Sequence, residues 1–152
     1  MEIILVRHAH AEDKSFWQRD LHRNLSEQGR NAMQIVMVQV DGYMTHPQDY
    51  RLLVSPANRT IQTAEYFAQA YDLSMEVEDF IYAQDTEAFS NFLDSLHSDE
   101  KLILVGHQPS LSEWAFSLSE QEIKFGKGDC VAFSRETEDK SFHILWRLST
   151  HA

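Results

Sequence analysis

Cysteine is almost absent from this chain of 152 residues, because Cys130 is the only one. A single thiol cannot form an internal disulfide, so a reducing compartment fits the chain best. Residues 1–6, MEIILV, lack the basic start and long apolar run of a secretory signal, and no apolar run approaches the ~18 residues of a membrane span. We therefore expect a soluble cytoplasmic protein in which Cys130 packs as a small hydrophobic side chain.

Basic residues are also scarce, since 13 Lys and Arg stand against 24 Asp and Glu, a formal charge of −11. Such a surface repels the phosphate backbone of a nucleic acid and disfavours nucleic acid as a partner. An acidic protein that handles phosphate must gather its few arginines in one place. The positions of Arg7, Arg23 and Arg59 therefore matter more than the number of arginines.

Three short aliphatic runs predict strands that are buried on both faces. They are residues 2–6, 51–54 and 101–105, and the last two are followed by the strand-breaking segments SP and GHQP. The length and the 43% hydrophobic residues suit one globular domain. No repeat, linker or low-complexity tract divides residues 1–152, so we expect a single domain.

Apolar residues at helical spacing predict helices between these strands. One begins after Ser26 as N-cap, and the others cover residues 58–71, 85–96 and 109–118. From residue 130 the pattern alternates, which predicts a hairpin turning through residues 138–140. The fold class expected is a three-layer α/β/α domain with a mainly parallel central sheet and a C-terminal antiparallel hairpin. On the last strand of that hairpin, one face is expected to carry Phe142, Ile144, Trp146 and Leu148.

The carboxyl ends of the three buried strands carry the residues suited to chemistry. They run into Arg7-His8, into the segment that contains Arg59, and into His107. Ligands bind beyond the carboxyl ends of strands in open α/β sheets, so these side chains should converge. Phosphoryl transfer needs positioned cations around three equatorial oxygens, and a neutral imidazole can attack phosphorus. The set therefore predicts metal-independent phosphoryl transfer, with no cofactor.

These motifs resemble those of the histidine phosphatase superfamily, which includes the phosphoglycerate mutases. Arg7-His8-Ala9 is similar to its Arg-His-Gly signature, residues 55–64 (SPANRTIQTA) to its second block, and Gly106-His107 to its third. The resemblance covers nearly the whole chain. It implies a phosphoglycerate mutase-like fold with His8 as the nucleophile. It also implies that Arg7, Arg59 and His107 bind the phosphoryl group.

Within the superfamily the chain most resembles the short SixA-like phosphohistidine phosphatases. Residues 107–109 of this chain match the ending His-x-Pro of those proteins. Residues 23–29 are similar to their Arg-Pro-Leu-Thr-x-x-Gly stretch, with Asn24 in place of proline. By that match Arg23 is a further phosphate ligand. Asp79 falls about where the short members carry an acid, which makes it the candidate general acid.

The substrate expected from this resemblance is a phosphohistidine on a protein of the phosphorelay or phosphotransfer type, in signal transduction. Longer members of the superfamily carry a glutamate general acid after the second block, and this chain shows no convincing counterpart of that glutamate. Its absence favours the phosphohistidine substrate, because imidazole leaves more readily than an alkoxide. Two alternatives remain open: a phosphatase of a small phosphate ester, and a module that only binds phosphoproteins. Phe16 and Trp17 are candidates to line the mouth of the site. No metal-ligand spacing involves the remaining histidines, which include His151.

Overall fold

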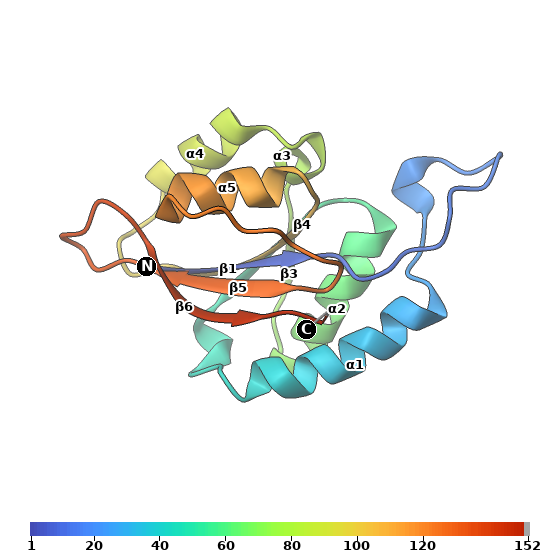
Figure 1. Cartoon of the computed structure of the whole chain (residues 1–152), viewed down its shortest axis with the longest axis horizontal. Helices are drawn as coiled ribbons and strands as arrows, with labels where there is room; N and C mark the ends of the chain where they lie inside the picture. The colour runs from blue at the N-terminus through green and yellow to red at the C-terminus, as the bar shows by residue number, and fades with distance from the viewer. Residues whose placement is uncertain (151–152) are drawn as a thin grey trace.

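The computed structural model describes residues 1–150, which form one six-stranded sheet between two layers of helices (Figure 1). The strand order is β3-β2-β4-β1-β5-β6; β3, β2, β4 and β1 run parallel, and β5 and β6 form the antiparallel hairpin. The expected fold class is confirmed. The strands are β1 (Glu2–Arg7), β2 (Arg51–Val54), β3 (Met75–Val77), β4 (Lys101–Gly106), β5 (Cys130–Ser134) and β6 (His143–Leu148).

The three aliphatic runs are the interior strands, as predicted. Along β1, Ile4 and Val6 pack into the core on one face of the sheet, and Ile3 and Leu5 pack into the core on the other face. All four side chains are fully buried. A strand whose side chains alternate between two cores must be apolar throughout, which explains the continuous run in the sequence.

Helices cover both faces of the sheet (Figure 1). The first and second long helices pack on the face that contains Ile4, and the others pack on the opposite face. No helix within residues 1–150 is long and apolar enough to cross a membrane. The helices are α1 (Glu27–Asp41), α2 (Asn58–Tyr71), α3 (Asp79–Ala83), α4 (Thr86–Asp94) and α5 (Ser110–Ser119), with 3₁₀ turns at Asp20–His22 and Pro47–Asp49.

The start of α1 is fixed by a cap and by a close approach. The Ser26 side chain accepts a hydrogen bond from the Gly29 amide at 3.0 Å, so the predicted N-cap is confirmed. Gly29 lies against the backbone of His10, where an added Cβ would overlap the His10 carbonyl oxygen. Only glycine therefore allows α1 to pack beside the segment that follows β1.

The hairpin corrects one expectation about side-chain direction. A bulge between Ala132 and Phe133 shifts the register of β6, with Trp146 opposite Ala132 and Ile144 opposite Phe133. A bulge reverses the alternation of faces. The prediction that these residues share one face is therefore wrong: Phe142 and Ile144 pack in the core beside α5, whereas Trp146 and Leu148 pack in the core beside α1.

Candidate active site

The ends of β1 and β4, the loop after β1, the start of α2 and the end of α3 enclose a polar cavity of about 370 Å³. Arg7 of β1 pairs with Gly106 of β4, and the His8 amide donates to the Gly106 carbonyl at 3.2 Å, so the first and third sequence motifs lie side by side. All five residues expected to act on the phosphoryl group line this cavity. The lining residues are Arg7, His8, Asp20, Arg23, Arg59, Tyr82, Gln84, His107 and Gln108.

His8 is held with one ring nitrogen free to act. Its Nδ1 lies 2.7 Å from the Ala9 carbonyl oxygen, which can only accept, so Nδ1 carries the proton and Nε2 carries the lone pair. Burial lowers the pKa of His8 to about 4, and the charges of Arg59 and Arg7 act in the same direction. At neutral pH the ring is therefore an uncharged imidazole with a nucleophilic nitrogen.

His107 stands beside His8, with ring centroids 5.5 Å apart. Its Nε2 lies 2.7 Å from Oγ of Ser55, which follows β2 and is fully buried. Burial lowers the pKa of His107 to about 3, and the charge of Arg59 contributes to the shift. The second ring is thus also neutral at neutral pH and can supply a hydrogen bond to an incoming oxygen.

Two arginines at the cavity have buried donors without a partner. Arg7 donates from Nη1 to the Phe125 carbonyl at 2.8 Å, and Arg59 donates from Nη1 to the Asp20 carbonyl at 2.9 Å. Within the described residues, however, Nε of Arg7 and Nε of Arg59 are buried and make no hydrogen bond. A buried donor without an acceptor costs free energy.

Asp20 is a charged residue of the cavity that the sequence did not predict. It lies on the loop after β1 and joins two arginines, with Oδ1 3.1 Å from Nε of Arg23 and Oδ2 3.0 Å from Nη2 of Arg59. Tyr82 donates its hydroxyl to the same Oδ2 at 2.9 Å. Burial acts to raise the pKa of Asp20, but these hydrogen bonds hold the pKa below its usual range. The one sequence signal was its spacing of three residues from Arg23, typical of a local ion pair.

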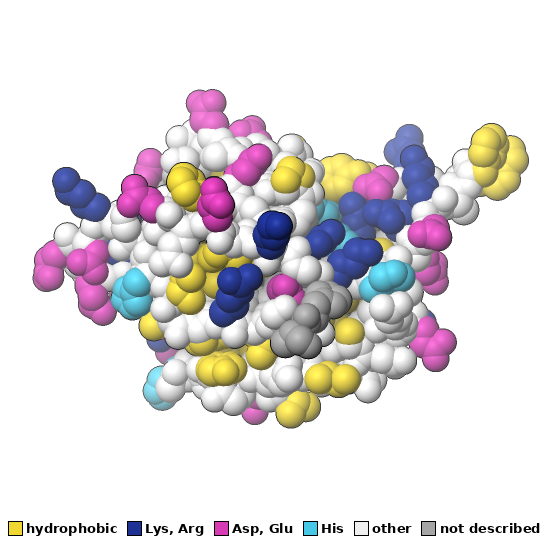
Figure 2. All heavy atoms as spheres, viewed as in Figure 1, with side chains coloured by type: hydrophobic (Ala, Val, Ile, Leu, Met, Phe, Trp, Pro, Cys, Tyr) yellow, Lys and Arg dark blue, Asp and Glu magenta, His cyan; other side chains and the backbone are white. Residues whose placement is uncertain are grey.

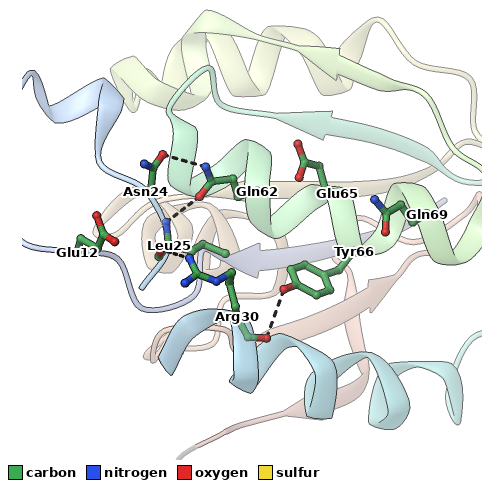
Figure 3. Close-up of a pocket in the computed structure, with 8 residues that line it drawn as sticks. All are labelled: Glu12, Asn24, Leu25, Arg30, Gln62, Glu65, Tyr66 and Gln69. Carbon is green, nitrogen blue, oxygen red and sulfur yellow. Dashed lines mark hydrogen bonds between the residues drawn. The ribbon is translucent and has the colours of Figure 1, made fainter. Parts of the chain in front are cut away.

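The segment that carries Arg23 is anchored to α2 by an amide network (Figure 3). Gln62 accepts from the Leu25 amide at 2.7 Å and donates to Oδ1 of Asn24 at 2.9 Å. Asn58 donates to the same Asn24 oxygen at 3.1 Å. Asn24, which replaces the usual proline, therefore ties the residue after Arg23 to the helix that begins with Asn58 and Arg59. The neighbouring hollow of about 440 Å³ is lined by this network, not by the histidines.

Three expected residues are not brought to the cavity. Among the described residues that line it, Asp79, Phe16 and Trp17 are absent. Asp79 is exposed at the start of α3, and that short helix turns Tyr82 toward the cavity instead. Phe16 and Trp17 lie in solvent, with 89% and 91% of their surface exposed. Neither β3 nor α3 was predicted, because each is too short to show a periodic pattern.

Metal ligands do not accompany these side chains. Within the part of the chain that the structure describes, no group of three or more His, Cys, Asp or Glu side chains could hold a metal ion. The groups that line the cavity are imidazole, guanidinium, carboxylate, phenol and amide groups.

Comparison with known proteins finds a family match over the part of the chain that carries the first two motifs. The family model of the histidine phosphatase superfamily (branch 1) matches residues 3–82. An uncharacterized protein of Picosynechococcus sp. is 33% identical over 132 residues, which cover 84% of this chain and 75% of the relative.

Solved structures with the same fold include two whose names state an activity. The protein histidine phosphatase SixA complexed with tungstate superposes with a TM-score of 0.82 at 21% identity, covering 98% of this chain and 97% of that one. A mycobacterial glucosyl-3-phosphoglycerate phosphatase superposes with a TM-score of 0.71 at 15% identity, covering 97% and 99%. At these identities the likeness concerns the fold.

Proposed function

This chain belongs to the histidine phosphatase superfamily, and from that membership we propose that it hydrolyses phosphohistidine on a protein substrate through a covalent phosphohistidine at His8. The observation that carries the proposal is the neutral His8 ring, which donates from Nδ1 to Ala9 and so keeps the Nε2 lone pair available beside three arginines.

In the first step, Nε2 of His8 attacks phosphorus and the bond from phosphorus to the substrate imidazole breaks. Arg7, Arg59 and His107 stabilise the charge that spreads over the three equatorial oxygens, and Arg23 is a fourth ligand. The positions of both Arg7 and Arg59 on the cavity lining support this role, because guanidinium groups offer planar, paired donors to phosphoryl oxygens. In the second step, water attacks the phosphohistidine, which releases inorganic phosphate and restores neutral His8.

The carboxyl groups near the cavity support an imidazole leaving group. Among residues 1–150, Asp20 is the only carboxylate that lines the cavity, and its lowered pKa keeps it ionised at neutral pH. Tyr82 is a weak acid, because burial and Asp20 raise the pKa of its hydroxyl. An alkoxide leaving group needs a proton from a nearby acid, whereas a substrate imidazole can leave already protonated on its other nitrogen.

A second candidate is hydrolysis of a small phosphate ester. The observation in its favour is the shared fold with a glucosyl-3-phosphoglycerate phosphatase. For that reaction Asp79, our candidate general acid, would have to reach the leaving oxygen from its exposed position on α3.

Phosphate release separates these functions. Wild-type protein and His8→Ala are compared, without added metal, on a histidine-phosphorylated phosphotransfer domain and on a panel of sugar phosphates. We expect release from the phosphoprotein that depends on His8. Preferential release from esters would favour the second candidate, and binding of the phosphoprotein without turnover would favour a binding module.

A further inference from the structure

The loop between β1 and α1 forms a projecting arm whose base belongs to the candidate active site. We define the arm as residues 12–24. It is closed at its base by a bridge between Ala11 and Leu25 and by a hydrogen bond of 2.8 Å from the Glu12 amide to the Asn24 carbonyl. Asp20 and Arg23 near the base line the cavity. Figure 1 shows the rest of the arm extending away from the body of the protein.

Two aromatic side chains occupy the outer part of the arm. Phe16 and Trp17 contact each other edge to face, with centroids 4.7 Å apart, and both are about nine-tenths exposed. Figure 2 shows a hydrophobic tip beyond a group of basic and histidine side chains, on a face that also carries many acidic groups. Exposed large aromatics that lie next to each other are typical of contact surfaces, where tryptophan is enriched among the residues that contribute most to binding.

The position of this pair selects the kind of partner. Trp17 is three residues from Asp20, so its backbone lies within about 11 Å of a cavity residue. A contact surface of standard size, about 800 Å² on each partner, has a radius of about 16 Å when it is centred on the cavity. A protein bound with its phosphohistidine in the cavity is therefore large enough to reach Phe16 and Trp17, whereas a small ester would fill the cavity without touching these two side chains.

We infer that Phe16 and Trp17 form a docking surface for the phosphohistidine-bearing protein, which contacts them through apolar side chains beside its phosphorylated histidine; this inference rests on the proposed function. Docking supplies affinity for the protein substrate, and the cavity supplies the chemistry. Among the described residues that line the cavity, neither Phe16 nor Trp17 is present, which agrees with this division of roles.

The test compares steady-state kinetics on two substrates that share the same chemistry. The variants are Trp17→Ala and the double variant Phe16→Ala/Trp17→Ala, and the substrates are a phosphorylated phosphotransfer domain and free phosphohistidine. We expect KM for the phosphoprotein to rise about 10-fold or more, with kcat nearly unchanged and with turnover of free phosphohistidine within about twofold of wild type. The control is Phe116→Ala, which removes an exposed aromatic on α5 and should change neither substrate.

Several results would overturn the docking surface. An unchanged KM for the phosphoprotein, with hydrolysis still dependent on His8, removes the inference and leaves the proposed function intact. Equal losses on both substrates mean that the arm shapes the cavity. If KM stays constant and the double variant loses binding to phosphatidylcholine–phosphatidylglycerol vesicles, the aromatic pair binds a membrane. If KM stays constant and the double variant loses self-association, the pair binds a second copy of the chain. If no phosphoprotein is hydrolysed with dependence on His8, the proposed function fails and the docking surface fails with it.

Discussion

The Asp20 carboxylate and the Arg59 guanidinium form an ion pair inside the candidate active site, with Oδ2 3.0 Å from Nη2. The Arg59 side chain is 7% exposed and the Asp20 side chain is 38% exposed, so the carboxylate lies on the solvent side of the pair. It also accepts from Nε of Arg23 and from the Tyr82 hydroxyl. Asp20 therefore occupies guanidinium donors that a phosphoryl group in the cavity would also engage.

Asp20→Asn is predicted to tighten the binding of tetrahedral oxyanions. The substitution removes a negative charge that competes for Arg23 and Arg59, and it keeps a carbonyl oxygen for Tyr82. Titration calorimetry with tungstate should show an affinity about 10-fold higher than that of wild type. The matched control is Asp79→Asn, an exposed carboxylate outside the lining residues, which should bind tungstate as wild type does. Weaker binding by Asp20→Asn would mean that the carboxylate mainly orients the two arginines.

The pKa of the His8 imidazole is predicted to lie far below that of a solvated histidine. Burial lowers its pKa to about 4, compared with an ordinary value near ~6.5. Titration of the His8 ring carbon-bound protons by NMR, assigned with a His8→Gln variant, should give a midpoint near pH 4. A midpoint near the ordinary value would contradict a buried neutral nucleophile.

The same shift predicts how stability depends on pH. The unfolded chain takes up a proton on His8 as the pH falls through about 6.5, while the folded chain stays neutral until about pH 4. Stability is therefore lost over this window, and His107 acts in the same direction. Urea unfolding at pH 7 and pH 4.5 should show a smaller loss for His8→Gln than for wild type. Equal losses of stability in wild type and His8→Gln would mean that groups other than His8 take up the protons.

Gly29→Ala is predicted to destabilise the protein and to disturb the arm. An added Cβ would overlap the His10 carbonyl oxygen, which also accepts from the Ser26 amide at 3.0 Å. Overpacking of this kind lowers the free energy of unfolding by about 1–3 kcal/mol, which urea unfolding detects as a lower midpoint concentration. Gly42→Ala is the control, because Gly42 has an ordinary helical conformation at the end of α1. A loss as large in Gly42→Ala would point to a general effect of removing glycine.

Much of the fold was predictable because its central strands are buried on both faces. The runs that became β1, β2 and β4 have no polar interruption, and α2 spans residues 58–71 as expected. The short elements β3 and α3 were not predicted, since three and five residues carry too little periodicity. The bulge in β6 was also missed, because it depends on pairing with β5 and not on the alternation of residues within β6.

The candidate site was predictable where it follows from strand ends. Arg7, His8, Arg59 and His107 meet because parallel strands deliver their carboxyl ends to one edge. Asp20 and Tyr82 come from a loop and from a short helix after an edge strand, whose directions no local pattern reveals. Asp79 illustrates the same limit, because its place in the sequence said little about which residue of α3 faces the cavity.

The covalent step at His8 is the central claim, and rapid-quench mass spectrometry of a single turnover tests it most directly. The enzyme is used in excess over a phosphorylated phosphotransfer domain, so that each substrate molecule is turned over once. The account predicts an acid-labile phosphoryl group on the peptide that contains His8, which forms as the substrate is consumed and then decays into inorganic phosphate. It also predicts that His8→Ala forms no such adduct and releases phosphate at least ~10³-fold more slowly. Phosphate release at the wild-type rate by His8→Ala, with no phosphorylated peptide at any time, would contradict it.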